Sequence, residues 1–381
     1  MNIKTITCHD VYNYGASLQA FALQTFLEKD GHNVEIIDYK PDYIDFPYKV
    51  STFVHPDSPV RRFTDKCSII RLLYGIKRYL WYIPTIGRKR AFDRFTKQYL
   101  KLTKKYSCND GLSKDVPAAD TYIVGSDQVW NSITMLNGSD SAFYLQFAPK
   151  SKKRLSYAAS FGGKKWDDLN LTEQITACLG KFVAISVRET SGKDICRDVF
   201  HVASECVLDP TLLLRDYSHL TVYSSLYKDA LFYYRVAYCS EWGDFADYLG
   251  ARLNLNVKIF SGQKRISWLP GMGGLNYVYP SIGIWLGAIA SSAFVVTDSF
   301  HTVVFAILNR KPFLVLPSVE QLMERIISLL EILEITDHYY SSIEEVKKTD
   351  AWLYPIDYDA VHLKLNTLRK DSLRFLFDHL K

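Results

Sequence analysis

The sequence predicts an α/β protein made of two Rossmann-like domains that face each other across a cleft. Short apolar, β-branched runs alternate with stretches of helical periodicity, and this alternation restarts near residue 228. The chain has 381 residues, 48% hydrophobic and 23% charged, which is too long for one ordinary core and suits two domains. We therefore expect domains over residues 1–215 and 216–357, and a closing helix over 358–381.

The first half opens with a β-α-β unit. Residues 2–8 indicate a strand, Asn13 and Gly15 a turn, and residues 17–29 an amphipathic helix. Four further strands are expected in this half, at residues 34–39, 119–124, 156–160 and 181–187, with a short strand and turn at 206–211.

The second half repeats the alternation. Strands are expected at residues 230–238, 256–261, 293–297 and 313–316, and helices at 245–253, 284–289 and 300–309. A glycine-rich loop at 270–274 precedes the second of these helices.

Ser299 and His301 lie at the most informative position of the chain. Ser299 suits the N-cap of the helix that follows the strand at 293–297, and His301 falls in its first turn. Open α/β sheets bind ligands there, because free N–H groups and the helix dipole favour an anion. The alternative is that Ser299 only caps the helix and His301 only packs.

Other polar side chains follow strands in the same way. Asn13, Asp127 and Gln128 are expected at carboxyl ends of strands in the first half, as is Arg188, whose guanidinium suits phosphate or carboxylate. Arg188 could instead form a structural ion pair with Glu189, and Asp127 could close an Asx-turn. The Asp209-Pro210 pair is predicted to be structural.

A basic, aromatic segment over residues 42–105 interrupts the alternation and predicts a helical insertion, with helices at 69–82 and 88–100. Residues 61–105 contain 14 Lys and Arg against two Asp, a charge of +12 in a chain of net charge +5. Such a segment suits peripheral contact with an anionic membrane surface, although a solvated basic face is the alternative. Without a recognition motif, no nucleic-acid partner is predicted.

The remaining patterns point to a cytoplasmic protein, at the inner face of a membrane if the basic segment binds one. No apolar run approaches the roughly 20 residues of a membrane span, and MNIKTITCHD has no signal-peptide pattern. The seven cysteines are scattered, as in a reducing compartment. No metal-ligand spacing or nucleotide fingerprint occurs, so neither a metal nor a tightly bound cofactor is expected.

Six segments resemble, in order, the motifs of the polysaccharide pyruvyl transferase family: NYGASLQAFAL (13–23), YIVGSDQVWN (122–131), SYAASFG (156–162), SVRE (186–189), VLDPTLLL (207–214) and VVTDSFHTVVFAILNRKPF (295–313). The resemblance implies a GT-B-like fold. It also implies transfer of pyruvate from phosphoenolpyruvate, as co-substrate, to a hexose of galactose type. The product would be a ketal on a lipid-linked polysaccharide precursor, with phosphate released.

The resemblance also implies roles for residues. Arg188 would hold the carboxylate or phosphate of the pyruvyl donor. His301 would contact the phosphate or act as the acid, beside Ser299, and Asp127 would be the base or an acceptor ligand. Asn13 and Gln128 would orient sugar hydroxyls, and Lys311 and Arg325 would be further cations for the donor. Thr302 departs from the family, which often has Gly there, and puts the geometry at the donor in question.

Two other functions fit the same fold. One is a GT-B-type glycosyltransferase that uses a nucleotide sugar, although the C-terminal acidic motif that binds the ribose is absent from the sequence. The other is a non-catalytic module of a polysaccharide assembly complex that binds sugar or a membrane surface.

Overall fold

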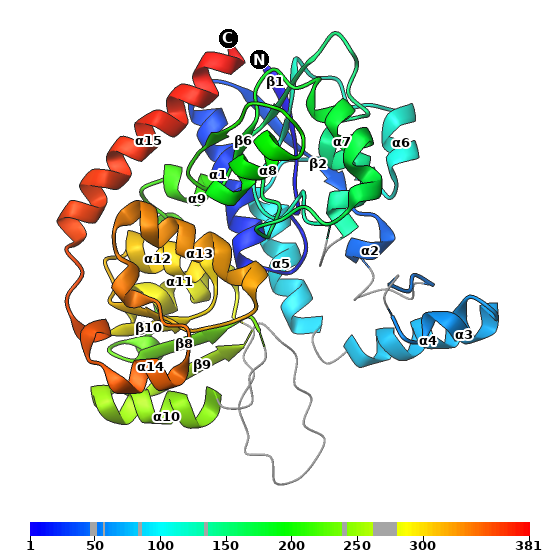
Figure 1. The fold of residues 1–381 in the computed structure, drawn as a ribbon. Coiled ribbons are helices and arrows are strands. Elements are labelled where there is room, and N and C mark those ends of the chain that lie inside the picture. Colours follow the sequence, from blue (N-terminus) through cyan, green and yellow to red (C-terminus); the bar gives the residue numbers. More distant parts are fainter. Residues whose placement is uncertain (46–51, 56–57, 83–85, 133–135, 238–241, 262–279) are drawn as a thin grey trace.

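The computed structural model describes residues 1–45, 52–55, 58–82, 86–132, 136–237, 242–261 and 280–381. It contains two α/β units in chain order, which confirms the predicted class (Figure 1). The predicted glycine-rich loop at 270–274 lies outside the described residues.

The first unit is built on a parallel sheet of order β3-β2-β1-β4-β5. Its strands are β1 (Asn2–Ile6), β2 (Asn33–Tyr39), β3 (Leu102–Tyr106), β4 (Thr121–Val124) and β5 (Lys153–Ser156). Single bridges from the β5 region continue it to a short parallel pair, β6 (Ser186–Val187) and β7 (Glu205–Cys206). The order reverses between β1 and β4, and ligands of open α/β sheets bind at such a switch point.

The second unit has a parallel sheet of order β11-β10-β8-β9. Its strands are β8 (Leu231–Arg235), β9 (Val257–Ser261), β10 (Phe294–Thr297) and β11 (Phe313–Val315). Here the switch point lies between β8 and β10.

Helices connect and cover the strands. In the first unit they are α1 (Tyr14–Lys29), α2 (Asp42–Asp45), α3 (Arg61–Thr64), α4 (Ser68–Tyr82), α5 (Ile86–Tyr99), α6 (Asn109–Lys114), α7 (Thr172–Leu179), α8 (Thr190–Asp198) and α9 (Pro210–Leu213). In the second they are α10 (Trp242–Leu253), α11 (Ile282–Ser291), α12 (Phe300–Leu308), α13 (Glu320–Leu333) and α14 (Ile343–Lys348), and α15 (Tyr358–Leu380) closes the chain.

The two units share one apolar core cluster, so their orientation is fixed by packing. The cluster joins Leu18 and Phe21 of α1 to Phe305 of α12. At the boundary, the Tyr14 ring stacks on Trp285 with centroids 4.9 Å apart, and its hydroxyl donates to the Pro280 carbonyl at 2.9 Å.

Helix α15 returns from the second unit to the first, as Figure 1 shows. Leu376 and Phe375 join a buried cluster with Ile3 and Leu23, and Ser372 Oγ accepts a hydrogen bond from the Leu208 amide at 3.0 Å. The predicted closing helix thus bridges the two units.

The structure corrects three expectations for the first unit. The strand predicted at 181–187 is only the two-residue β6, Ser186–Val187. The strand predicted at 156–160 is β5 at Lys153–Ser156. It cannot continue to residue 160, because Ala158 has a left-handed backbone conformation with φ of 54°. The segment 42–105 is not one insertion: β3 pairs with β2, and α5 buries Phe92 and Phe95. Strand β3 escaped notice because an edge strand rich in lysine resembles a solvated turn.

Leu376→Ala tests the role of α15. Leu376 is fully buried against the first unit, so we expect the variant to lose roughly 2–5 kcal/mol of unfolding free energy, seen as a lower melting temperature. Leu363→Ala on the same helix is the control, because Leu363 is 71% exposed and should change stability by less than about 0.5 kcal/mol. Equal shifts for both variants would contradict the bridging role.

Candidate functional site: an anion pocket between two switch points

The carboxyl ends of strands from both units line one pocket of about 120 Å³. The first unit contributes residues that follow β1 and β4, and the second contributes residues that follow β8, β10 and β11. The lining residues are Val11, Asn13, Asp127, Gln128, Val236, Asp298, Ser299, Phe300, His301, Leu322 and Arg325. The two topological switch points therefore face each other across this pocket.

Two helix N-termini, one from each unit, meet at the pocket. Asn13 caps α1, and its Oδ1 accepts from the Gly15 amide at 2.9 Å, so its NH₂ group points away from that helix. Ser299 caps α12, as predicted, and accepts from the Thr302 amide at 3.4 Å. Both helix dipoles favour an anion here.

Gly15 makes this approach possible. A Cβ atom at Gly15 would lie 1.8 Å from His301 Nδ1, so the His301 ring packs directly against the first turn of α1. Only glycine leaves room for the ring. The closeness of the two units at the pocket therefore depends on this residue.

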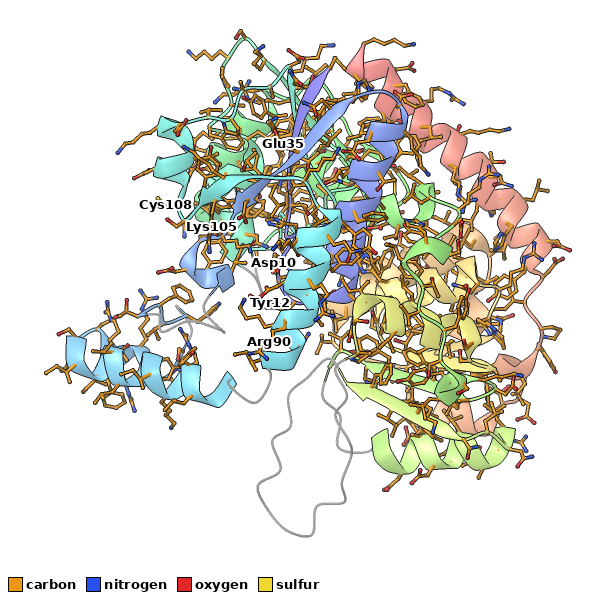
Figure 2. The ribbon with its side chains drawn as sticks, turned by 180° about the vertical axis from the view of Figure 1, so that it is seen from behind. Asp10, Tyr12, Glu35, Arg90, Lys105 and Cys108 are labelled. Carbon is orange, nitrogen blue, oxygen red and sulfur yellow. The ribbon has the colours of Figure 1, made fainter. Side chains whose placement is uncertain are left out.

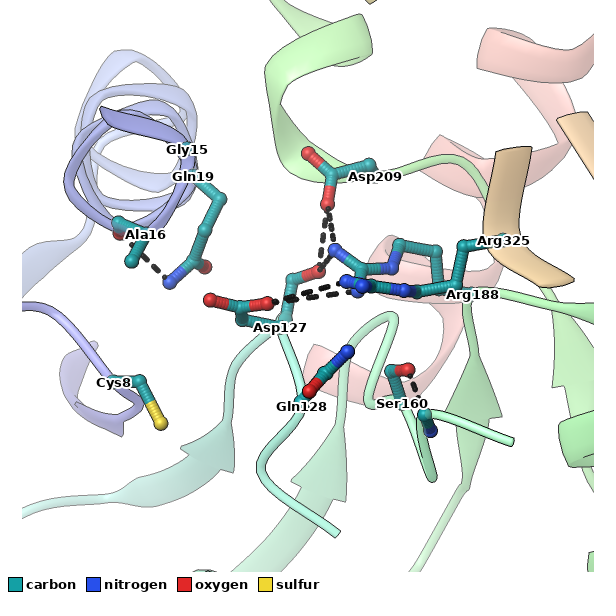
Figure 3. A network of polar contacts seen from close by, with 12 residues as sticks. Cys8, Gly15, Ala16, Gln19, Asp127, Gln128, Ser160, Arg188, Asp209 and Arg325 are labelled. Carbon is teal, nitrogen blue, oxygen red and sulfur yellow. Dashed lines mark hydrogen bonds and ion pairs between the residues drawn. The ribbon is translucent and has the colours of Figure 1, made fainter. Parts of the chain in front are cut away.

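Arg188 is the buried cation at the centre of the site (Figure 3). Its side chain is 1% exposed, its Nη1 donates to Asp209 Oδ2 at 3.0 Å, and its guanidinium lies 4.7 Å from the centroid of the Phe300 ring. Within the described residues, its Nε and Nη2 have no hydrogen-bond partner. A buried guanidinium with two free donor atoms is suited to a bidentate anion.

Two more side chains that carry nitrogen atoms, Arg325 and His301, line the pocket. Arg325 comes from α13, and burial together with the charge of Arg188 lowers its pKa to about 10. Within the described part of the chain, neither Arg325 Nε nor His301 Nε2 has a hydrogen-bond partner, and His301 Nε2 lies 3.7 Å from Asp209 Oδ2. The predicted residues Arg188, His301 and Arg325 are thus brought together.

Asp127 lies between the two arginines. Its Oδ1 is 3.6 Å from Arg188 Nη2 and 3.7 Å from Arg325 Nη1, too long for hydrogen bonds. The residue has φ of 77°, and its carbonyl accepts from the Ser160 amide at 3.0 Å. The carboxylate therefore faces the pocket, whereas the alternative prediction was that it would close an Asx-turn.

Gln128 is 8% exposed, and its Oε1 accepts from Asn131 Nδ2 at 3.0 Å. Because Oε1 points toward Asn131, the NH₂ group of Gln128 points away from Asn131. Gln128 and Asn13 thus bring amide donors to the part of the pocket formed by the first unit.

Asp209 belongs to the site although its sequence context indicated a structural role. Its carboxylate caps α9 by accepting from the Thr211 amide at 2.9 Å, and it also accepts from Ser126 Oγ at 2.8 Å. Burial alone would raise the pKa of Asp209, but His301 and Arg188 hold it well below its usual range. An Asp-Pro helix cap gave no sign of this second role.

Glu189 is also buried beside Arg188, but it is not the main partner predicted by the ion-pair alternative. Its Oε2 lies 3.9 Å from Arg188 Nε, while Oε1 accepts from Ser160 Oγ at 2.8 Å. Burial raises the pKa of Glu189 despite the nearby Arg188.

Lys311 does not reach the pocket. It lies between the end of α12 and the start of β11, at the amino edge of the sheet, and its carbonyl accepts from the Tyr358 hydroxyl. Helix α12 carries the chain from the carboxyl edge, where Ser299 lies, to this opposite edge. Thr302, the departure from the family pattern, is buried within α12 and is not among the lining residues.

A second cavity, of about 270 Å³, is lined by Arg188, Asp209 and Phe300. Leu329 of α13 and Leu368 of α15 give it apolar walls, and Lys193 of α8 lines its edge. Phe300 therefore lines both cavities, whereas Arg188 lines only the second. No cluster of three or more potential metal ligands occurs within the described ranges.

Fold and pocket define an α/β protein with a buried anion site between two Rossmann-like units. A family model described as polysaccharide pyruvyl transferase matches residues 13–318, a range that includes every strand except β1 and most of the residues that line the pocket. The chain belongs to the polysaccharide pyruvyl transferase family and is a transferase.

Solved structures of other enzymes resemble the whole chain at low identity. They include Arabidopsis thaliana UGT89C1 complexed with UDP-L-rhamnose (10% identity, 98% of this chain, 94% of that chain, TM-score 0.48). Another is S. aureus MnaA with UDP (13% identity, 96% of this chain, 90% of that chain, TM-score 0.45). A third is the glycosyltransferase SnogD from Streptomyces nogalater (10% identity, 98% of this chain, 96% of that chain, TM-score 0.44). Nothing about the chemistry follows from these scores. Curated protein sequences gave no match.

Asp209→Asn should destabilise the protein in a pH-dependent way. Because the pKa of Asp209 is lower in the folded than in the unfolded chain, its stabilisation is present above about pH 4 and is lost as the pH falls further. We expect a loss of about 3–5 kcal/mol at pH 7, which shrinks below about pH 4, in denaturation at several pH values. The control is Asp337→Asn, because Asp337 is exposed. A stability difference between Asp209→Asn and the wild type that stays constant with pH would contradict this account.

Gly15→Ala should displace His301 and lower the transferase activity roughly 100-fold, because misplacement by about 1 Å can have that effect. Gly87→Ala is the matched control: Gly87 lies in helix α5, and an added Cβ meets nothing within 4 Å. Full activity of Gly15→Ala with unchanged melting temperature would show that the position of His301 does not matter.

Proposed function

We propose that the protein transfers pyruvate from phosphoenolpyruvate to two hydroxyls of a hexose, forming a ketal and releasing phosphate. The hexose, of galactose type, would belong to a lipid-linked surface polysaccharide precursor. The observation that carries the proposal is the convergence of buried nitrogen groups on Arg188, His301 and Arg325 around the carboxylates of Asp127 and Asp209, next to the pocket that His301 and Arg325 line. The family of the chain supplies the reaction class.

The pyruvyl donor carries a carboxylate and a phosphate, so its site needs at least two anion anchors. Arg188 offers Nε and Nη2 to one anionic group, and Arg325 with the N-terminus of α12 offers a second anchor. The Phe300 ring holds the guanidinium of Arg188 in place from one side.

The reaction balances with protons alone. A proton is added to the methylene carbon, which makes C2 an oxocarbenium-like electrophile. One sugar hydroxyl attacks C2, the C2–O bond to phosphate breaks, and the second hydroxyl completes the ketal. Of the two hydroxyl protons, one replaces the proton given to carbon and the other leaves with phosphate. His301 can serve as the acid and then as the base for the hydroxyl.

Asp127 would compete with the donor for the two arginines. Its Oδ1 lies 3.6 Å from Arg188 Nη2 and 3.7 Å from Arg325 Nη1. An incoming anion would compete with this carboxylate for the same nitrogens. Donor binding would thereby release the Asp127 carboxylate from both arginines. Asn13 and Gln128 would hold sugar oxygens with their free amide groups on the acceptor side.

We place the reaction in the cytoplasm, at the inner face of the membrane. The cysteines of the described ranges are unpaired, as is usual in a reducing compartment. No helix in the described part is both long and apolar enough to cross a bilayer.

Phosphate release from phosphoenolpyruvate, measured with a panel of hexose acceptors, tests the proposal. We expect His301→Ala to lower the rate about 10²–10⁴-fold, as for loss of a general acid. Arg188→Ala should abolish the melting-temperature rise produced by phosphoenolpyruvate. Arg374→Ala, an exposed arginine on α15, is the control and should behave as the wild type.

Nucleotide sugars belong in the same melting experiment. Stabilisation by a nucleotide sugar, with none by phosphoenolpyruvate, would refute the proposed donor and favour a glycosyltransferase. A ligand present at 100 times its dissociation constant adds about 2.7 kcal/mol, which is readily detected.

A further inference from the structure

Helices α3 and α4 pack on each other and project from the body of the first unit (Figures 1 and 2). Helix α4 has 15 residues. At about 1.5 Å per residue it is roughly 22 Å long, too short to cross a hydrocarbon core of about 30 Å.

The apolar stripe of α4 faces solvent. Five aliphatic side chains, between 37% and 67% exposed, recur at intervals of three or four residues along one side: Ile69, Leu72, Leu73, Ile76 and Leu80. On the opposite side, Gly75 is buried and Tyr74 is partly buried. A surface helix of a globular protein normally turns its apolar face inward, so this orientation is the reverse of the usual one.

The charge around the stripe is positive. Helix α4 contains no acidic residue. Lys66 and Lys77 are exposed and form no ion pair within the described ranges, while the nearby Asp65 is already paired with Arg61 and Arg71.

An aliphatic stripe flanked by cations fits an anionic lipid interface better than a protein groove. A protein partner would need an apolar groove with an acidic rim of matching shape, whereas a bilayer supplies acyl chains and phosphates together. We propose that α4 lies in the interface of an anionic membrane, with its stripe among the acyl chains and Lys66 and Lys77 at the phosphates.

This inference does not depend on the chemistry of the pocket, and it explains how the enzyme would meet an acceptor carried on a lipid. Binding to vesicles and turnover of a water-soluble acceptor can therefore fail separately.

Sedimentation with vesicles of phosphatidylcholine, with and without phosphatidylglycerol, tests the proposal on the full chain. We expect binding only to the anionic vesicles, and weaker binding at high salt. A triple variant of the stripe should weaken binding at least about tenfold, because three aliphatic side chains no longer enter the bilayer. It carries Ile69→Gln, Leu73→Gln and Leu80→Gln. Lys66→Gln, Lys77→Gln should weaken it by about fivefold per lysine.

The matched control is Leu169→Gln, Leu226→Gln, Leu363→Gln, which removes three similarly exposed leucines outside α4. It should bind vesicles as the wild type does. If the stripe variant melts at a lower temperature, the lysine variant decides, because those side chains are exposed and should not affect folding.

Three results would overturn the proposal: no binding to anionic vesicles, equal losses in stripe and control variants, or a concentration-dependent dimer that the stripe variant abolishes. The last result would assign the stripe to a second copy of the chain. All α4 variants should retain phosphate release with a water-soluble acceptor, and loss of that activity alone would concern the pocket.

Discussion

Arg188 and Asp209 form an ion pair that is hidden from water, and the rest of the site depends on it. Removing two ions from water is costly, and their attraction offsets the cost only when further hydrogen bonds satisfy both. Asp209 is satisfied by Ser126 and Thr211 as well as by Arg188. Arg188 is not, because its Nε and Nη2 lack partners in the described residues. The hydrogen bonds of the carboxylate are complete and those of the guanidinium are not, which supports the proposal that a second anion binds beside Arg188.

The fold brings this pair to the boundary of the two units by topology. The strand order reverses between β1 and β4 in the first sheet and between β8 and β10 in the second. At these switch points the chain leaves β1 to enter α1 and leaves β10 to enter α12. Gly15 lets α1 approach α12 until only the His301 ring separates them. The shared core at Tyr14 and Trp285, together with α15, then holds the units at that distance.

Sequence patterns predicted the fold class and placed Asp127, Arg188 and His301 at strand ends, because strand, cap and helix leave local signals. They missed Asp209, since a helix-capping Asp-Pro looks the same whether or not its second oxygen holds an arginine. Lys311 was expected to be a further cation for the donor because it lies close to His301 in the sequence, but it lies at the amino end of β11. The periodicity also could not show that the apolar stripe of α4 faces solvent. A helical pattern shows that one face is apolar, but not whether that face turns toward the core or toward solvent.

The positive charge of the chain therefore acts in two physically distinct places. Around α4 it is exposed, so its attraction for an anionic surface extends only about 8 Å at physiological salt and weakens as salt rises. In the pocket, Arg188 and Arg325 are buried beside Asp127 and Asp209, which cancel their long-range field but leave free nitrogens at short range. If α4 lies on an anionic membrane, as we propose, the surface charge would attract the protein to it without drawing anions indiscriminately into the pocket. Recognition there rests on the geometry of a few buried nitrogens, which salt screens little.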